Sequence, residues 1–155
     1  MDRSEIQTVL ERCEFFKGFE KSNIEKIADL CRVESFESGD YVFRQGDFGD
    51  CLYIISEGQV VLERSVDLGT RKGSAIIGML GKGRVFGCWS TLLDEPHNLM
   101  SSVHCVKPAR LLVITGANLR EMMLQNRSLG FNVLERLCFL LRDRIQSAYG
   151  AMEKI

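Results

Sequence analysis

The spacing of apolar residues changes twice along the chain. Over residues 1–31 they recur every three or four positions, which predicts two helices. Ser4 with Gln7 and Ser22 with Glu25 have the spacing of capping boxes, so we expect the helices to begin near these two serines. The apolar residues on the helix faces are Ile6, Val9 and Leu10 in the first helix and Ile24, Ile27, Ala28 and Cys31 in the second.

From about Arg32 apolar residues alternate with polar ones, which predicts short, half-buried strands. Clusters rich in Gly and Asp separate the strands, because these residues tolerate the backbone conformations of tight turns. We expect Glu57-Gly58-Gln59 to form a tight hairpin turn. Short strands at spacings of about 8–12 residues favour an antiparallel sandwich, jelly roll or barrel. The expected strands cover residues 33–36, 41–43, 51–55, 60–64, 74–80, 101–106 and 110–114.

Helical spacing returns after Gly116, with a short helix around Leu119 and a long helix from about Leu129 to Met152. One face of the long helix carries an apolar row that approximates a heptad repeat. Such a row either packs on the sheet or pairs with a second helix. Because the helix extends past a compact roll, we expect a homodimer through this C-terminal helix. The row consists of Leu134, Leu137, Leu141, Ile145 and Ala148, followed by Met152 and Ile155.

The order of these elements predicts one domain with a mainly β fold and flanking helices. No repeat, low-complexity tract or linker composition divides the chain. We expect N-terminal helices over residues 1–31, a β-roll over residues 32–115, and C-terminal helices for dimerisation over residues 117–153.

Charge and composition narrow the range of partners. With 20 Lys and Arg against 21 Asp and Glu, the formal net charge is -1, so there is no basic excess to favour nucleic acid. The charged N-terminus lacks the apolar core of a secretory signal, and no apolar run approaches the roughly 18 residues of a membrane span. We therefore expect a soluble, cytoplasmic protein that makes no membrane contact.

Residue types that catalyse reactions or bind metals are present, but not in the required patterns. The six cysteines form no C-x-x-C pair, so we expect reduced thiols among apolar neighbours rather than a zinc or iron–sulfur site. His97 and His104 are the only histidines, and their separation does not match a metal pair on one helix face. No nucleophile–base arrangement stands out either. We expect neither an enzyme nor a metal centre.

Residues 39–60, with the sequence GDYVFRQGDFGDCLYIISEGQV, place several glycines in register with apolar strands. This segment resembles the cyclic nucleotide-binding domain of catabolite-activator-type regulators, kinase regulatory subunits and gated ion channels. The similarity extends over nearly the whole chain, because Phe15–Phe19, Gly83–Gly87 and Ala109–Ile114 resemble further segments of that family. It implies an antiparallel β-roll, also called a jelly roll or double-stranded β-helix, that binds a cyclic nucleotide such as cAMP or cGMP.

In that family the ligand binds a phosphate-binding cassette, which runs from Phe-Gly-Glu through a short helix to Pro-Arg-x-Ala-Ser/Thr. The Glu accepts from the ribose 2′-hydroxyl, the Arg pairs with the phosphate, and the free N–H groups of the helix point at the phosphate. Residues 86–103 occupy this place in the chain. The resemblance implies ligand contacts at Gly87, Cys88, Trp89, Ser90, His97, Asn98, Leu99, Ser101 and Ser102.

Both charged anchors of the family cassette are replaced in this sequence. Cys88 stands at the Glu position. Leu99 occupies the Arg position when the cassette is aligned back from Ser101, whereas His97 occupies it when the cassette is aligned forward from Pro96. Removing one partner of a buried charge pair costs about 2–5 kcal/mol, which is roughly a 30-fold to several-thousand-fold loss of affinity.

Three interpretations of the pocket follow from these replacements. The pocket binds a cyclic nucleotide weakly or through substitute groups, it binds a different and less charged small molecule, or it is an empty pocket in a dimerisation or docking module. Trp89 either stacks on the ligand or fills the core, and Ser101 and Ser102 are either phosphate donors or ordinary strand hydroxyls.

The resemblance also raises the question of whether the chain carries a DNA-binding domain. Activator-type relatives carry a helix-turn-helix after the long helix, whereas this sequence ends at Ile155. We therefore expect no DNA-binding domain in this chain. The chain is either a free-standing regulatory sensor or the sensor half of a longer transcription regulator.

Overall fold

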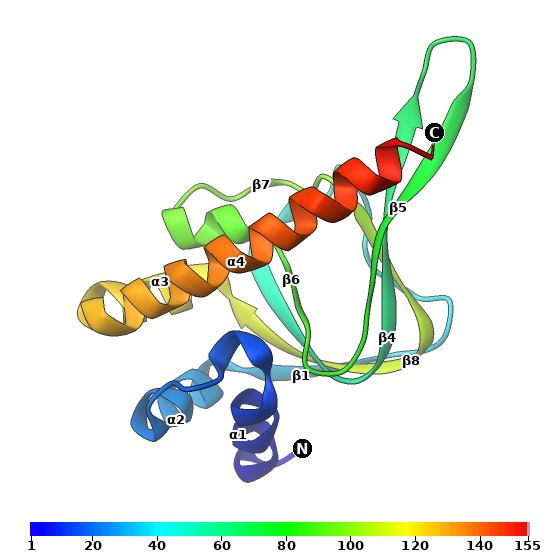
Figure 1. The fold of residues 1–155 in the computed structure, drawn as a ribbon. Coiled ribbons are helices and arrows are strands. Elements are labelled where there is room, and N and C mark those ends of the chain that lie inside the picture. The colour runs from blue at the N-terminus through cyan, green and yellow to red at the C-terminus, as the bar shows by residue number, and fades with distance from the viewer. Residues whose placement is uncertain (155) are drawn as a thin grey trace.

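Helices from both ends of the chain flank a rolled antiparallel sheet in the computed structural model (Figure 1). The structure describes residues 1–154, so Ile155, the expected last residue of the apolar row, lies outside the described residues. The architecture confirms the predicted mainly β fold with flanking helices. The helices are α1 Arg3–Arg12, η1 Glu14–Phe16, α2 Lys21–Leu30, η2 Trp89–Leu93, α3 Gly116–Gln125 and α4 Arg127–Met152, where η marks a short 3-10 helix.

Six strands form one sheet in which β4 and β8 are the long central pair. The path is β1-β8-β4-β5, with β2 also paired to β8 and β6 to β4, while β3 and β7 form a separate two-stranded sheet. All of these pairings are antiparallel. The strands are β1 Arg32–Phe36, β2 Tyr41–Phe43, β3 Phe48–Gly49, β4 Cys51–Asp67, β5 Lys72–Leu80, β6 Val85–Gly87, β7 His97–Asn98 and β8 Ser102–Thr115.

The first helix begins at a different cap from the one expected. Asp2, in extended conformation, accepts the Glu5 backbone N–H at 2.8 Å, and the Glu5 carboxylate accepts the Asp2 N–H at 2.7 Å. This capping box precedes the predicted one at Ser4, because a carboxylate pair satisfies both free amides reciprocally. The second helix begins after Glu20, which makes no side-chain cap, and not at Ser22.

The hairpin predicted at Glu57–Gln59 is wrong, because β4 continues through these residues from Cys51 to Asp67. Gly58 does have the positive φ that a turn requires, at +98°, but it bends the strand instead of ending it. A Cβ at this position would lie 2.4 Å from the Pro108 carbonyl oxygen of β8. The two predicted strands flanking Pro108 likewise form one strand, β8. Both long strands therefore run the length of the roll.

Two apolar clusters stabilise the fold. One joins the helices to one face of the roll, and the other fills the roll interior. Adjacent residues of β8 serve different clusters, since Leu111 and Val113 belong to the interior and Leu112 and Ile114 to the helix side. This alternation follows from the two-residue period of a strand, and it explains why the end of β8 reads as a continuous apolar run.

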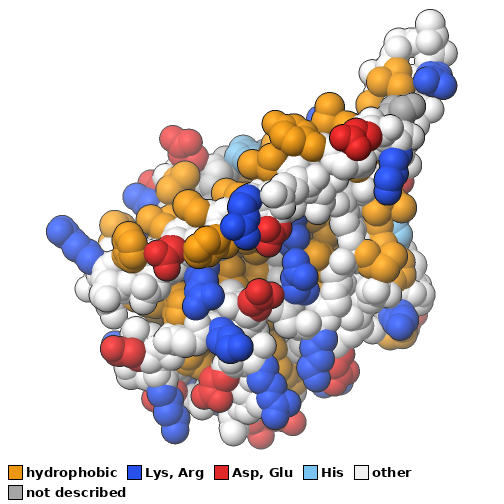
Figure 2. All heavy atoms as spheres, in the orientation of Figure 1, with side chains coloured by type: hydrophobic (Ala, Val, Ile, Leu, Met, Phe, Trp, Pro, Cys, Tyr) orange, Lys and Arg blue, Asp and Glu red, His pale blue; other side chains and the backbone are white. Residues whose placement is uncertain are grey.

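The long helix α4 carries two apolar rows, one buried and one exposed. The buried row includes Val133 and Leu137, which is 6% exposed and packs in the helix-side cluster. Leu137 is therefore a core residue and not part of a dimer seam. Of the other four predicted seam residues, Leu134 is 38% and Ile145 52% exposed, Ala148 is partly exposed, and Leu141 is partly buried and packs against the helix-side cluster. Figure 2 shows hydrophobic side chains along this outer side of the helix.

The exposed row follows the heptad spacing more closely than the predicted one. Counting from Phe131, the steps alternate between three and four residues, as in the a and d positions of a coiled coil. The residues of this row are Phe131, Leu134, Cys138, Leu141, Ile145, Ala148 and Met152. Among residues 1–154, no helix is long and apolar enough to cross a membrane.

Candidate functional site

The predicted cassette is held between β4 and the start of β8. β6 pairs with β4, with Gly87 opposite Leu52, and η2 follows directly. At Gly87, φ is +139° and a Cβ would lie 2.4 Å from the Cys51 carbonyl oxygen, so only glycine fits. The Cys88 N–H donates to that same oxygen at 3.0 Å. The retained glycine therefore fixes where the cassette leaves the sheet.

Cys88 and Leu99, which the sequence resemblance aligns with the family's Glu and, in one of two alignments, its Arg, lie close together in an apolar environment. Cys88 is 2% exposed and Leu99 8%. Both border Gly49 of β3, since a Cβ there would lie 2.7 Å from Leu99 Cδ2 and 3.0 Å from Cys88 Cβ. The Cys88 thiol has only weak polar neighbours, at 3.5 Å from Ser90 Oγ and 3.8 Å from the His97 carbonyl oxygen. The two side chains are therefore buried beside each other and beside Gly49.

The two alternatives for the Arg position differ in where the chain places them. Leu99 is buried, with its backbone bonded to Gly46 and Asp47. His97 and Asn98 form the short exposed strand β7, and His97 Nδ1 lies 2.6 Å from the Asn98 carbonyl oxygen. The structure thus brings the Leu99 side chain near Cys88, whereas His97 approaches Cys88 through its backbone carbonyl.

Trp89 turns towards the helices instead of joining Leu99. Its ring stacks on Phe15 with centroids 6.1 Å apart and packs against the helix-side cluster. Ser90 is half-buried, with its hydroxyl beside the Cys88 thiol and its carbonyl accepting the Glu95 N–H. These contacts favour the core-filling interpretation of Trp89.

The two serines after the cassette have different surroundings. Ser102 Oγ accepts the Gln45 backbone N–H at 2.8 Å, and the Gln45 side chain in turn accepts the Ser65 N–H at 2.8 Å. Ser102 therefore ties the loop after β2 to the sheet. Ser101 is half-buried one residue before β8.

Arg64 is a cation at the cassette that the sequence prediction missed. Its guanidinium donates to the Met100 carbonyl, next to Leu99. The pairing of β4 with β8 is regular from Val60 to Glu63, so strand alternation places Arg64 in phase with Val60 and Leu62, two residues of the roll interior. No carboxylate lies within 4 Å of Arg64 in the described part of the chain. The sequence could have indicated Arg64, because this cation lies two residues after Leu62 and four after Val60, in the positions of an alternating strand that face the roll interior.

The cassette helix η2 contacts α3 directly. The Arg120 guanidinium of α3 donates to the Leu92 carbonyl at 2.7 Å. Thr91 of η2 lies against Gly116, the first residue of α3, where a Cβ would meet the Thr91 hydroxyl at 1.8 Å. A displacement of the cassette would therefore reach α3 without an intervening element.

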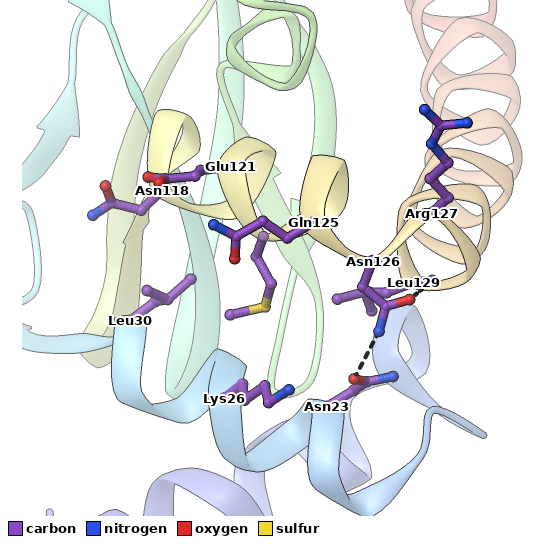
Figure 3. A pocket seen from close by; sticks show the side chains of 10 residues that line it. Asn23, Lys26, Leu30, Asn118, Glu121, Gln125, Asn126, Arg127 and Leu129 are labelled. Atoms are coloured by element: carbon purple, nitrogen blue, oxygen red, sulfur yellow. Dashed lines mark hydrogen bonds between the residues drawn. The ribbon is translucent and has the colours of Figure 1, made fainter.

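A cavity of about 620 Å³ lies among α2, α3 and the beginning of α4. Figure 3 shows its polar lining, which includes Lys26, Glu121 and Arg127. The Asn126 side chain caps α4 by accepting the Leu129 N–H, and it donates to the Asn23 side chain across the cavity at 3.3 Å. These two bonds join the α3–α4 junction to the N-terminal helices.

Metal-ligating and thiol side chains are the remaining groups with chemical potential among the described residues. No group of three or more His, Cys, Asp or Glu side chains is placed to hold a metal ion within residues 1–154. Burial raises the pKa of the Cys13 thiol to about 11 and that of Cys31 to about 12, which makes both poor nucleophiles at neutral pH. Cys138, between Leu137 and Phe139, is a free thiol that is exposed on α4.

Comparison with known proteins agrees with this geometry. Residues 33–126 match the family model described as the cyclic nucleotide-binding domain. The chain belongs to this family. A cGMP-dependent protein kinase of Caenorhabditis briggsae is 32% identical over 92 residues, which cover 59% of this chain and 12% of the kinase.

Solved structures of cyclic nucleotide-binding domains share the fold. A Methylobacillus flagellatus cyclic nucleotide-binding domain superposes with a TM-score of 0.79 at 21% identity, covering 99% of this chain and 84% of that one. The regulatory domain of Toxoplasma gondii PKA with cAMP gives a TM-score of 0.68 at 26% identity, covering 78% of this chain and 45% of that one. The chain spans 12%, 29% and 28% of the first three curated relatives it matches. It therefore corresponds to the binding domain of those proteins.

Proposed function

We propose that this cyclic nucleotide-binding domain is a regulatory sensor that binds a cyclic nucleotide with reduced affinity, using Arg64 in place of the cassette Arg. The observation that carries the proposal is the Arg64 guanidinium at the Met100 carbonyl, beside the buried Leu99. A guanidinium offers several N–H donors to a phosphate. The printed names of two relatives support a cyclic nucleotide, because one is a cGMP-dependent kinase and the other is a PKA regulatory domain with cAMP.

The reduced affinity follows from the missing carboxylate. Cys88 replaces the Glu that accepts from the ribose hydroxyl, and a buried thiol is a weak acceptor. A net loss of about 2–3 kcal/mol would move a micromolar site to a dissociation constant of roughly 30–150 µM. Arg64 restores the phosphate contact but not the ribose contact.

A less charged small molecule is the second candidate ligand. The apolar contact of Leu99 and Cys88 around Gly49 favours it, because these side chains suit a ligand surface that carries no charge. The two candidates differ in their need for Arg64, which only an anionic ligand uses.

Signalling would pass from the cassette to the C-terminal helices. A ligand that shifts η2 would pull Arg120 through the Leu92 carbonyl and displace Thr91 against Gly116. The bond between Asn126 and Asn23 holds α3 and α4 in their present position over the cavity. A useful signal requires about 1–3 kcal/mol of differential affinity between two helix arrangements.

Isothermal titration calorimetry with cAMP and cGMP tests the ligand. We expect saturable binding with a dissociation constant of about 30–150 µM for at least one of the two. At 100 times that constant, the ligand should stabilise the fold by roughly 2.7 kcal/mol in thermal unfolding. No heat and no stabilisation at 10 mM ligand would contradict a cyclic nucleotide and leave the less charged ligand.

We further propose that the domain forms a homodimer through the exposed heptad row of α4. The row carries large apolar side chains, including Phe131 at 66% and Ile145 at 52% exposure, which a second copy would cover. In a parallel pair, equivalent a and d positions of the two helices face each other. The row would therefore place the two copies of Cys138 side by side.

Oxidative cross-linking with copper phenanthroline tests this dimer without any substitution. Cys138 is the exposed thiol of the described residues, whereas Cys13, Cys51, Cys88 and Cys105 are buried. We expect a reducible dimer band that Cys138→Ser abolishes. Leu141→Asp, which places a charge in the row, should give a monomer in sedimentation. A monomeric wild type at 100 µM would refute the dimer.

The surroundings of the domain are also part of the proposal. Six free thiols suit a reducing compartment, so we place the domain in the cytoplasm. The segment or partner that responds to the position of α4 would lie outside residues 1–154 and could be a DNA-binding or catalytic domain.

A further inference from the structure

A second cavity, of about 190 Å³, lies between α4, η1 and the turn before β6. Its lining includes Arg84, Arg136 and Arg142, with Glu14 and Asp143 as the only carboxylates. We call it the arginine cavity. Figure 2 shows Lys and Arg side chains on the face below α4 in that view, with Asp and Glu side chains among them.

Most of these guanidiniums have backbone partners or none. Arg142 bonds its neighbour Asp143 at 3.2 Å, and Arg136 donates to the Lys17 carbonyl at 2.6 Å. Within residues 1–154, no carboxylate lies within 4 Å of the guanidinium of Arg84 or Arg136. The cations of the cavity are therefore only partly compensated.

Arg144 adds a fourth positive charge beside the cavity. It donates to the Val85 carbonyl at 2.7 Å. Its pKa is lowered to about 10, first by burial and then by the positive charge of Arg84, while Asp143 opposes the shift. Four guanidiniums against two carboxylates leave a local excess of positive charge, which an anion would neutralise.

We propose that the arginine cavity binds a phosphate group. Paired guanidiniums match the geometry of phosphate oxygens, and each N–H···O bond to such a group is charge-assisted. The cavity, of about 190 Å³, has room for a phosphate group. This site is separate from the one proposed at Arg64.

A phosphate bound here would connect α4 to the cassette. Arg84 and Val85 lead directly into β6 and Gly87, while Arg136, Arg142 and Arg144 belong to α4. An anion contacting both elements would hold the helix against the strand that leads into the cassette. Phosphate would then act on the position of α4 independently of the ligand in the roll.

Titration of ¹⁵N-labelled protein with inorganic phosphate tests the site. Sodium chloride keeps the ionic strength constant, and no cyclic nucleotide is present. We expect saturable amide shifts at residues 83–85 and 136–144, with millimolar affinity. Arg84→Gln and Arg142→Gln should each weaken binding at least tenfold, whereas Arg110→Gln, on an exposed position of β8, should not. Thermal unfolding of each variant checks that the fold is retained.

Two outcomes would overturn the proposal. One is an affinity for phosphate that Arg84→Gln and Arg142→Gln leave unchanged. The other is a set of shifts centred on Arg64 and Met100 instead of residues 83–85, which would assign the phosphate to the cassette. Calorimetry with cAMP is a separate measurement, so failure of either site is distinguishable from failure of the other.

Discussion

Gly58→Ala is expected to lower the free energy of unfolding by about 3 kcal/mol or more, or Tm by about 6–12 °C. Two costs add at this position. The φ of +98° costs a residue with a Cβ about 1–2 kcal/mol. The new Cβ would also lie 2.4 Å from the Pro108 carbonyl and 2.7 Å from Ala109 Cα, both backbone atoms of β8. Because β4 and β8 are paired and neither can move alone, this steric clash lowers the free energy of unfolding by about 1–3 kcal/mol more.

Two matched substitutions separate these costs. Gly46 has a φ of +91° but nothing within 4 Å of a Cβ, so Gly46→Ala should cost only about 1 kcal/mol. Gly78 in β5 has neither a positive φ nor a neighbour, so Gly78→Ala should be neutral or slightly stabilising. Urea unfolding followed by circular dichroism measures all three. Equal losses for Gly58→Ala and Gly46→Ala would show that contact with β8 is not the main constraint.

Arg64→Gln is expected to weaken cyclic-nucleotide binding by about 30-fold or more. The guanidinium lies at the end of the cassette, and losing a charge-assisted bond to a phosphate costs about 2–3 kcal/mol. Stability should change little, since Arg64 is exposed and its one hydrogen bond is to a carbonyl. Arg64→Lys should give an intermediate affinity, because an ammonium keeps the charge but lacks the paired donors.

The control for this measurement is Arg110→Gln, which removes an exposed Arg from a stretch of β8 that pairs with β1. It should leave the dissociation constant unchanged. If Arg64→Gln binds cAMP or cGMP as tightly as the wild type does, then Arg64 is not the substitute cation.

The sequence was sufficient to predict the fold because the roll depends on many repeated local signals. Alternation of apolar residues located the segments of the long strands, although it divided both β4 and β8 into two, and Gly46 and Gly58 have the predicted positive φ. A glycine with positive φ suits a turn and a bent strand equally well, so Gly58 alone could not decide between them. The deciding contact, with the Pro108 carbonyl, comes from a strand nearly fifty residues away and is visible only in three dimensions.

The cassette was less predictable, for two physical reasons. The Arg position depended on alignment across a slightly elongated loop, and spacing along the sequence does not show that Leu99 is buried against Gly49 while His97 is exposed. Arg64 was missed because it comes from β4, outside the cassette segment. Leu137 was included in the expected dimer row because the two apolar rows of α4 are adjacent, and its burial in the helix-side cluster is not visible from spacing alone.

The adjacency of those two rows makes α4 sensitive to twisting. Successive residues of a helix are turned by roughly 100°, so Val133 and Leu134, or Leu137 and Cys138, head in directions only that far apart. A modest rotation of α4 about its own axis would move the buried row away from the roll. The same rotation would move the exposed row away from a partner bound to it. A displacement at the start of α4 would therefore rotate the whole helix about its axis. A partner bound to the exposed row would respond to that rotation.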